Sequence, residues 1–281
     1  MSTLLKFLVP GLLVFGLLVW LGLPRLLVGL GFHRHYELPA MDLSGKRALI
    51  VATSHATLGE GGRPTGVAAS ELTAAYYAFA DSGMRVDVAS IQGGQIPIDP
   101  QTLRWPVIST PDRRYLKDEE AVSRVADSLK ISEVDTTGYD IVYLAGGWGA
   151  AYDFGQSAVL GQKMADAHEA GAIVGGVCHG PLGFLQAEKP DGGLLIEGRR
   201  LTGVTDKQIR ELGITQTPLH PERELRAAGV IFEADTAFRD LFADQTVVDG
   251  RIVTGQNQNS ATETAVTMMQ TLIDLSMGPD V

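Results

Sequence analysis

The first thirty residues form one long apolar segment. From Phe7 to Pro24 the chain carries no charged residue, and Lys6 and Arg25 bracket this stretch. Continued to Leu30, a helix here is long enough to cross roughly 30 Å of hydrocarbon at about 1.5 Å per residue. A cleavable signal peptide is the runner-up, but no small-x-small cleavage site follows. A buried core helix fits poorly, because the segment has no polar side. The pattern therefore predicts one transmembrane helix.

Positive residues near this segment predict its orientation. Lys6 and the α-amino group precede it, whereas Arg25, Arg34, Lys46 and Arg47 follow it. Because positive charge is enriched on the cytoplasmic side of membrane helices, the bias favours a single-pass protein with a cytoplasmic domain after the helix. A free thiol also suits a reducing compartment. The expected organisation is a membrane anchor over residues 1–32, a linker over 33–45 and a folded domain over 46–281.

From residue 46 onward, short apolar runs alternate with segments of helical periodicity. Buried strands are predicted at 47–53, 85–90, 141–144 and 172–177, with later strands around 230–233 and at 246–254. Helices are predicted at 66–82, 111–130, 157–170, 180–187 and 261–275. The dipeptide Asp249-Gly250 marks a hairpin turn between two apolar runs. This alternation indicates an α/β fold, in which helices cover both faces of a mostly parallel sheet.

Charge and cysteine content exclude some kinds of protein. The formal net charge is −10, and residues 1–40 contribute +2, which leaves −12 for the rest of the chain. An acidic domain without a basic stripe is a poor match for nucleic acid, because phosphate contacts need clustered Lys and Arg. A single cysteine excludes a disulfide within the chain and a four-cysteine zinc site. A lone cysteine is usually a small buried hydrophobic residue, so its neighbours decide its role.

The surroundings of Cys178 indicate a nucleophile. It lies in the segment Gly176-Val177-Cys178-His179-Gly180, directly after a predicted strand. This spacing is the nucleophile-elbow pattern with Cys in place of Ser, because a sharp strand-to-helix turn needs small residues two positions before and after the nucleophile. A helix that begins after Cys178 is expected to lower the pKa of the thiol, and His179 adds a charge or a base. The alternative is that Cys178 is an unreactive buried residue and that His179 follows it by chance.

Two further features are candidates for the same site. Gly146 and Gly147 follow a predicted strand, where their N–H groups, with that of His179, are suited to form an oxyanion hole. A plain strand-to-helix turn would look the same. Glu71 lies within the apolar stripe of the helix predicted at 66–82. A carboxyl group on a buried face has a raised pKa and is suited to shuttle protons beside a thiol, whereas a glutamate at the edge of the stripe would reach solvent.

No cofactor or metal site follows from the sequence. The chain has neither a dinucleotide-binding fingerprint nor a P-loop. His55, Glu60 and His179 are candidate metal ligands by type, but their spacing is not diagnostic. We therefore expect neither a bound cofactor nor a metal ion.

Taken together, these segments resemble the ThiJ/PfpI superfamily of class I glutamine-amidotransferase-like proteins. The resemblance is closest to the branch of heat-shock chaperones and glutathione-independent glyoxalases, also called glyoxalase III. It covers the chain from about residue 46 to the C-terminus and leaves the apolar segment outside. The residues that carry it are Ile50-Val51-Ala52-Thr53-Ser54-His55, Thr65-Gly66 followed by Glu71, Gly146-Gly147, Cys178-His179-Gly180-Pro181, Thr202-Gly203 and Thr254-Gly255-Gln256-Asn257.

The resemblance implies a flavodoxin-like, doubly wound sheet and a homodimer. It implies a Cys nucleophile at Cys178 with a neighbouring His179, and it assigns a catalytic role to Glu71. Trp148 stands where this branch often has a histidine after the double glycine. The acidic partner of the histidine is expected shortly after Thr202-Gly203, where Asp206 is the nearest acidic residue. If Gln208 occupies the expected place instead, the triad is incomplete and amidase or peptidase chemistry is less favoured.

The function that the resemblance implies is conversion of a small carbonyl substrate, methylglyoxal, into D-lactate without glutathione. Cys178 would attack the aldehyde, Glu71 and His179 would move a proton between adjacent carbons, and Gly147 would help to hold the oxyanion. The alternatives are an amidase, peptidase or deglycase of the same superfamily, and a membrane-tethered stress chaperone. A scaffold that has lost its catalytic activity is a further alternative. The joint presence of Cys178, His179 and Glu71 argues against it.

Overall fold

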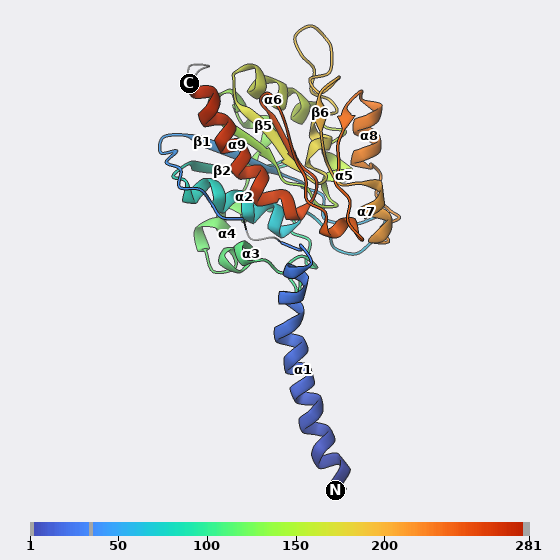
Figure 1. Cartoon of the computed structure of the whole chain (residues 1–281). Helices are drawn as coiled ribbons and strands as arrows, with labels where there is room; N and C mark the ends of the chain where they lie inside the picture. Colours follow the sequence, from blue (N-terminus) through green and yellow to red (C-terminus); the bar gives the residue numbers. More distant parts are fainter. Residues whose placement is uncertain (1–2, 34–35, 278–281) are drawn as a thin grey trace.

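One long helix extends away from a layered α/β domain (Figure 1). This computed structural model describes residues 3–33 and 36–277; Arg34, counted above among the orienting charges, lies outside them. The long helix is α1 (Thr3–Gly29), and its stretch Leu8–Gly29 is long and apolar enough to cross a membrane, a property that a signal sequence shares. Pro10 and Pro24 lie within α1.

The domain is built on a seven-stranded sheet with the order β3-β2-β1-β4-β5-β9-β8. Its strands are β1 (Arg47–Ala52), β2 (Arg85–Ser90), β3 (Leu129–Lys130), β4 (Ile141–Leu144), β5 (Ile173–Val177), β8 (Thr246–Asp249) and β9 (Ile252–Gly255). All neighbours pair in parallel except β8 and β9, which form the antiparallel hairpin predicted from Asp249-Gly250. The central order β2-β1-β4-β5-β9 is that of flavodoxin-like folds.

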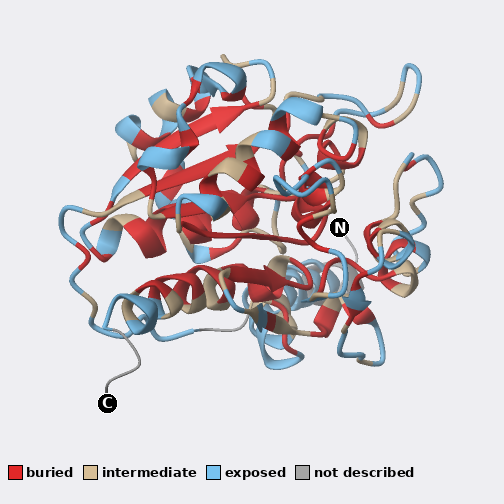
Figure 2. Cartoon of the chain, turned by 90° about the horizontal axis from the view of Figure 1, so that it is seen from above, coloured by how far each residue is buried: buried red, intermediate tan, exposed pale blue. Residues whose placement is uncertain are grey.

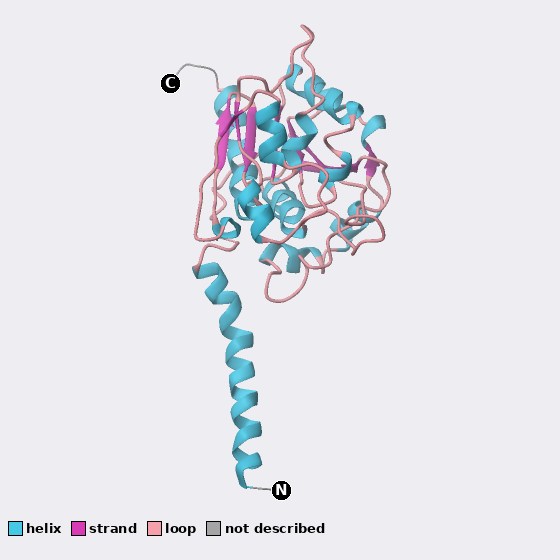
Figure 3. Cartoon of the chain, turned by 90° about the vertical axis from the view of Figure 1, so that its right-hand side faces the viewer, coloured by secondary structure: helices cyan, strands magenta, loops and turns pink. Residues whose placement is uncertain are grey.

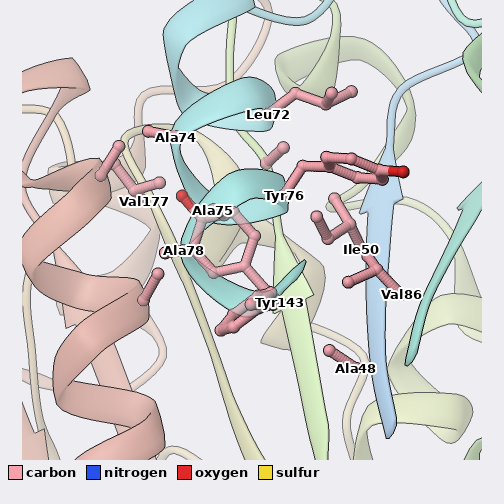
Figure 4. Close-up of a cluster of buried hydrophobic side chains, with 14 of the residues drawn as sticks. Ala48, Ile50, Leu72, Ala74, Ala75, Tyr76, Ala78, Val86, Tyr143 and Val177 are labelled. Atoms are coloured by element: carbon pink, nitrogen blue, oxygen red, sulfur yellow. The ribbon is translucent and has the colours of Figure 1, made fainter. Parts of the chain in front are cut away.

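Helices cover both faces of this sheet (Figures 2 and 3), as predicted. One face packs against α2 (Ala69–Asp81) and α9 (Ala261–Ser276), and the other against α5 (Ala150–Asp153), α6 (Ala158–Glu169) and the 3-10 turn η3 (Gly180–Phe184). Ile50 and Tyr143, from β1 and β4, lie beneath α2 in the first of these cores (Figure 4). Every residue of β4 and β5 is buried, which explains their uninterrupted apolar sequences.

The structure departs from the predicted elements where polar caps divide the chain. Residues 111–130 form two short helices and a strand in place of one helix: α3 (Thr110–Tyr115), α4 (Glu119–Ala126) and β3. Ser109 and Asp112 form a reciprocal capping box at the start of α3, and the side chain of Asp118 accepts a bond from Ala121 N–H at the start of α4. A capping residue within the segment starts a new helix, so the prediction of one continuous helix was wrong.

Between η3 and β8 the sequence pattern predicted only one strand, and the structure holds further elements there. The strand expected around 230–233 is β7 (Ile231–Phe232), which pairs with β6 (Arg200–Leu201) in a separate two-stranded sheet. Two helices follow β6, namely α7 (Asp206–Glu211) and α8 (Pro221–Ala227). The remaining 3-10 turns are η1 (Ile131–Glu133), η2 (Thr136–Gly138), η4 (Asp240–Phe242) and η5 (Gln258–Ser260).

Candidate active site

Cys178 follows β5 directly and adopts a strained backbone conformation. Its φ of +63° lies in the left-handed region, which among the described non-glycine residues only His33 shares. A Cβ atom on Gly176 or on Gly180 would come within 2.5 or 2.3 Å of the Leu144 carbonyl oxygen. Glycine is therefore required on both sides of the turn, as the elbow spacing predicts.

The double glycine after β4 brings backbone N–H groups to the sulfur. A Cβ atom on Gly146 would lie 2.6 Å from Glu71 Oε2, and one on Gly147 would lie 2.4 Å from Ala68 N. Without side chains, this loop lies directly against Glu71 and the start of α2. The N–H groups of Gly147 and His179 are close enough to Cys178 Sγ to stabilise its thiolate. Of the predicted oxyanion donors, Gly147 and His179 thus face the nucleophile, whereas the N–H group of Gly146 faces Glu71.

Glu71 lies in the first turn of α2 and is buried beneath this loop. Its residue is 1% exposed, which excludes the alternative in which the carboxyl group reaches solvent. Burial raises the pKa of Glu71 to about 8, against a smaller opposing effect of the Cys178 thiol and the Gly146 N–H. Its Oε2 atom makes no hydrogen bond of ordinary geometry to any described residue. At neutral pH the group is therefore a protonated acid.

The thiol and the imidazole are also uncharged at neutral pH. Burial raises the pKa of the Cys178 thiol well above its ordinary value, and the neighbouring Glu71 raises it further. The lowered thiol pKa expected from the sequence is therefore wrong, because η3 is only a five-residue 3-10 turn and burial outweighs the nearby N–H groups. Burial lowers the pKa of His179 to about 3, with a smaller contribution from His220.

His179 lies between the sulfur and an aromatic wall. Its Nδ1 atom is 3.4 Å from Cys178 Sγ, and its ring centroid is 4.8 Å from that of Trp148. Trp148, which follows the double glycine, thus packs against the imidazole. The Nε2 atom of His179 is buried and has no hydrogen-bond partner among the described residues. The Nε2 atom of the imidazole, on the side away from the sulfur, is therefore not hydrogen-bonded to an acidic side chain of the described residues.

Asp206 pairs with a different histidine. Its Oδ1 atom lies 2.9 Å from His220 Nδ1, because Thr205 caps α7 and Asp206, the first residue of the helix, faces the start of α8. Gln208 points the other way and accepts a hydrogen bond from Asn257. His220 was missed in the sequence, where its only signal is a position just before Pro221 at a helix start.

The other candidate metal ligands do not join this site. His55 stacks on Tyr152 with ring centroids 4.0 Å apart. Within the described part of the chain, no three His, Cys, Asp or Glu side chains come together in a way that suits a metal ion. The half-buried carboxylate of Asp153 instead holds the loop after β1, where it accepts hydrogen bonds from Thr53 Oγ1 and Ser54 N–H.

The raised pKa of Glu71 makes stability depend on pH. Between pH 4.5 and about 8 the folded state keeps a proton that the unfolded state has lost, so rising pH lowers the free energy of unfolding. The expected slope from this group is about 1.4 kcal/mol per pH unit. Glu71→Gln should remove this slope, so the variant gains stability relative to wild type as pH rises through this window. Urea denaturation of the full chain in detergent over a pH series measures it.

The matched control for this measurement is Glu119→Gln, which removes an exposed carboxylate from the first turn of α4. This variant should keep the wild-type slope. Parallel pH profiles for wild type and Glu71→Gln would contradict the burial of an ionisable carboxyl group at residue 71.

Comparison with known proteins identifies the family of this chain. The DJ-1/PfpI family matches residues 64–271, and α1 lies outside the match. Glyoxalase 3 of Candida albicans is 29% identical over 228 residues, which cover 78% of this chain and 95% of that protein. The glutathione-independent glyoxalase HSP31 of Saccharomyces cerevisiae is 27% identical over 243 residues, covering 82% of this chain and 99% of that protein.

Solved structures agree with this match. Rapid Encystment Protein 24 kDa of Francisella tularensis has a TM-score of 0.75 at 29% identity, covering 81% of this chain and 99% of that one. Glyoxalase III of Candida albicans has a TM-score of 0.74 at 26% identity, covering 80% of this chain and 97% of that one. Because the family match spans most of the chain and every residue of the site around Cys178, this protein belongs to the DJ-1/PfpI family.

Proposed function

We propose that this protein is a glutathione-independent glyoxalase, which converts methylglyoxal and similar small dicarbonyls into 2-hydroxy acids such as D-lactate. The observation that carries the proposal is the enclosed contact of one thiol, one protonated carboxyl group and one neutral imidazole at Cys178, Glu71 and His179. The names of the related glyoxalases support it.

The enclosure of the site favours a very small substrate. Cys178 is 7% exposed, and Glu71 and His179 are each 1% exposed. Trp148 covers one side of His179, so little space is left for a peptide chain beside the sulfur. A three-carbon dicarbonyl with no charge loses little on entering an uncharged site, whereas a charged or extended substrate would lose its hydration.

The chemistry balances within the substrate and uses no external oxidant. The Cys178 sulfur bonds to the aldehyde carbon, and the thiol proton ends on the aldehyde oxygen, which gives a hemithioacetal. A base removes the hydrogen from that carbon as a proton, and a proton is returned to the neighbouring carbon. The first carbon is thereby oxidised to a thioester while the second is reduced to an alcohol. Water then cleaves the thioester, which releases the 2-hydroxy acid and restores the thiol.

The side chains around the sulfur suit these proton transfers. Glu71 and Cys178 share a buried environment in which only one negative charge is readily formed, so loss of one proton from the pair yields the reactive anion. His179 has its Nδ1 beside the sulfur and hydrogen-bonds there. Because its pKa is lowered to about 3, Glu71 is the stronger base of the two and would carry the proton between the carbons. The N–H groups of Gly147 and His179 would stabilise the negative oxygen of the enediolate.

Amide hydrolysis is less well supported. It needs an imidazolium that an acid stabilises while the tetrahedral intermediate forms. Here Asp206 bonds to His220, and the Nε2 atom of His179 has no partner among the described residues. We therefore rank amidase, peptidase and deglycase activity below dicarbonyl conversion.

We also propose that α1 anchors the enzyme in a membrane as a single pass, with the domain over residues 46–281 on the cytoplasmic side and residues 33–45 as the connection. The length and apolar character of Leu8–Gly29 support the anchor. The resemblance to the family supports a homodimer, to be measured by light scattering on the detergent-solubilised chain.

Loss of the thiol should abolish turnover. For the full chain in detergent, Cys178→Ala should eliminate conversion of methylglyoxal to lactate in the absence of glutathione, because no covalent intermediate forms. Gly203→Ala is not a suitable control, because its Cβ would press on the Cys178 carbonyl oxygen; Leu212→Ala, on the exposed end of α7, is expected to leave the rate unchanged. Turnover that survives in folded Cys178→Ala would eliminate this mechanism and favour a chaperone role.

The pH dependence of turnover should report the carboxyl group. Since the pKa of Glu71 is raised to about 8, kcat/KM of wild type should rise with pH until about 8 as the Glu71–Cys178 pair loses its proton. Glu71→Gln should lower kcat/KM by roughly 10²- to 10⁴-fold and should remove this limb. A wild-type profile that is flat from about pH 7 to about pH 9, one unit either side of the expected midpoint, would show that another group is the base.

Membrane attachment should survive alkaline carbonate. The full chain expressed in cells should stay in the membrane pellet, because burial of an apolar span of this length is effectively irreversible. The same chain without residues 1–32 should move to the supernatant. Release of the full chain by carbonate would contradict the anchor, and mass spectrometry showing a new N-terminus after Gly29 would assign α1 to a signal peptide.

A further inference from the structure

Two polar features beside Cys178 have no part in the reaction described above. The Nε2 atom of His179 is buried on the side of the ring away from the sulfur, and it has no hydrogen-bond partner among the described residues. The hydrogen bond between Asp206 and His220 is likewise unused. Buried polar atoms of native proteins are nearly always paired, so an unpaired imidazole nitrogen in an active site calls for a functional explanation.

His220 lies beside the turn that holds Cys178. The Cys178 carbonyl oxygen accepts a hydrogen bond from the N–H group of Val204 at 3.0 Å. A Cβ atom on Gly203 would lie 3.0 Å from the same oxygen and 3.4 Å from Pro221 Cβ. The residue that follows His220 therefore packs on the segment that lies directly against the nucleophile.

The imidazoles of His179 and His220 are close enough for their charges to interact. Burial is the main reason why the pKa of His179 is lowered to about 3, and the charge of His220 is the second reason. Such an effect requires a short separation, because the interaction of two charges falls with distance and with exposure to water. The His220 side chain is 22% exposed. It therefore connects the surroundings of the buried imidazole with solvent.

Asp206 fixes the orientation of the His220 ring. Its Oδ1 atom lies 2.9 Å from His220 Nδ1. A carboxylate only accepts hydrogen bonds, so Nδ1 carries the ring proton and Nε2 keeps a free lone pair. Glu222 Oε2 accepts a hydrogen bond from Asp206 N–H at 2.9 Å, and Arg223 Nη2 lies 3.5 Å from Asp206 Oδ2. His220 is also the N-cap residue of α8, but its side chain makes no capping bond there.

The proposed reaction releases one proton per turnover. A dicarbonyl and water give a 2-hydroxy acid, which is ionised at neutral pH because the pKa of a carboxylic acid in water is about 4. The pair of Glu71 and Cys178 is a much weaker acid, since the pKa of Glu71 is raised to about 8. The product therefore leaves its proton on the pair. That proton must be lost before the next turnover, although the pair is almost closed to solvent.

We propose that His179 and His220 form a relay that carries this proton from the active site to solvent, with Asp206 as a positioning residue. The proposal rests on the function proposed above, and it gives the buried Nε2 atom of His179 its role. The relay would be a property of the segment from Gly203 to Pro221 and would leave the chemistry at the substrate carbons with Glu71.

Each proton in the relay has a source and a destination. The thiol proton of Cys178 passes to Nδ1 of His179, while the proton on Nε2 of His179 passes through a water molecule to Nε2 of His220. His220 then gives a proton to solvent. When the thioester is cleaved, the leaving sulfur takes the Nδ1 proton of His179, and Nε2 takes the proton of the newly formed acid. An imidazole with a pKa of about 3 passes a proton on and does not keep it.

The test measures kcat for conversion of methylglyoxal to lactate by the full chain in detergent, at low and at high concentrations of imidazole buffer. Sodium chloride keeps the ionic strength constant, and a blank without enzyme is subtracted. At low buffer, His220→Ala should lower kcat by roughly 10²-fold, because proton release then limits turnover. Free imidazole should restore most of the rate, since it accepts the proton in place of the missing side chain. Wild type should not respond to the buffer concentration.

A second variant and a control accompany this measurement. Asp206→Asn no longer fixes the proton on His220 Nδ1, so it should lower kcat by a smaller factor, and imidazole should restore the rate. It gives the same test should His220→Ala fail to fold. The control His168→Ala removes another partly buried histidine, from the last turn of α6. His168 precedes β5, whereas Cys178 follows it, so this variant should keep the wild-type kcat at both buffer concentrations.

The outcomes separate the relay from the proposed function. A wild-type kcat in His220→Ala at low buffer would overturn the relay. So would a loss of rate that imidazole does not restore in a variant that is folded by circular dichroism, because that pattern indicates a structural role. In both cases turnover by wild type leaves the proposed function standing. Absence of turnover by wild type at every buffer concentration would overturn the function and the relay together.

Discussion

The left-handed conformation of Cys178 is the constraint on which the site depends. A side chain in that conformation is strained, and it persists only because the surrounding backbone leaves no alternative. The Leu144 carbonyl oxygen presses on both flanking glycines, Gly176 and Gly180, so β4 and β5 hold the turn between them. The same turn places the His179 N–H beside the sulfur and directs its imidazole toward Trp148. Backbone packing of the central sheet, more than any side-chain contact, therefore positions the reactive atom.

Burial then decides the charge state of the site. A thiol at the start of a long exposed helix would ionise easily, but Cys178 lies under Glu71 and precedes only a short 3-10 turn. Two acidic groups that share one dry environment resist carrying two charges, so the pair holds its protons until one of them is lost. This arrangement separates the enzyme from cysteine proteases, in which an imidazolium partner keeps the sulfur ionised.

Much of the fold could be predicted from the sequence because its central strands are buried on both faces. Such strands are short, uninterrupted apolar runs, and β2 and β4 were predicted with the bounds that the structure gives them. The turn at Cys178 and His179 could be recognised because it needs small residues on both sides. The helical pattern around Glu71 left both a buried and a solvent-exposed carboxyl group open, and the catalytic roles of these residues stay predictions. The pairing of Asp206 with His220 could not, since it depends on how the loop after α7 returns to α8. Nor could the thiol pKa, because burial depth is a property of the assembled layers.

The tie between α1 and the domain has a consequence for how the enzyme can move. A flexible linker would let the domain rotate freely above the bilayer. Here Trp105 donates a hydrogen bond to Trp20, nine residues before the end of α1, and His33 donates one to Asn259 just beyond the helix. Two contacts at different positions along one helix prevent the domain from rotating about the end of α1. In a bilayer, Cys178 would therefore keep a constant height and orientation relative to the headgroups. Rotational freedom would be left only about the bilayer normal, so dicarbonyls would be intercepted at one level above the lipid.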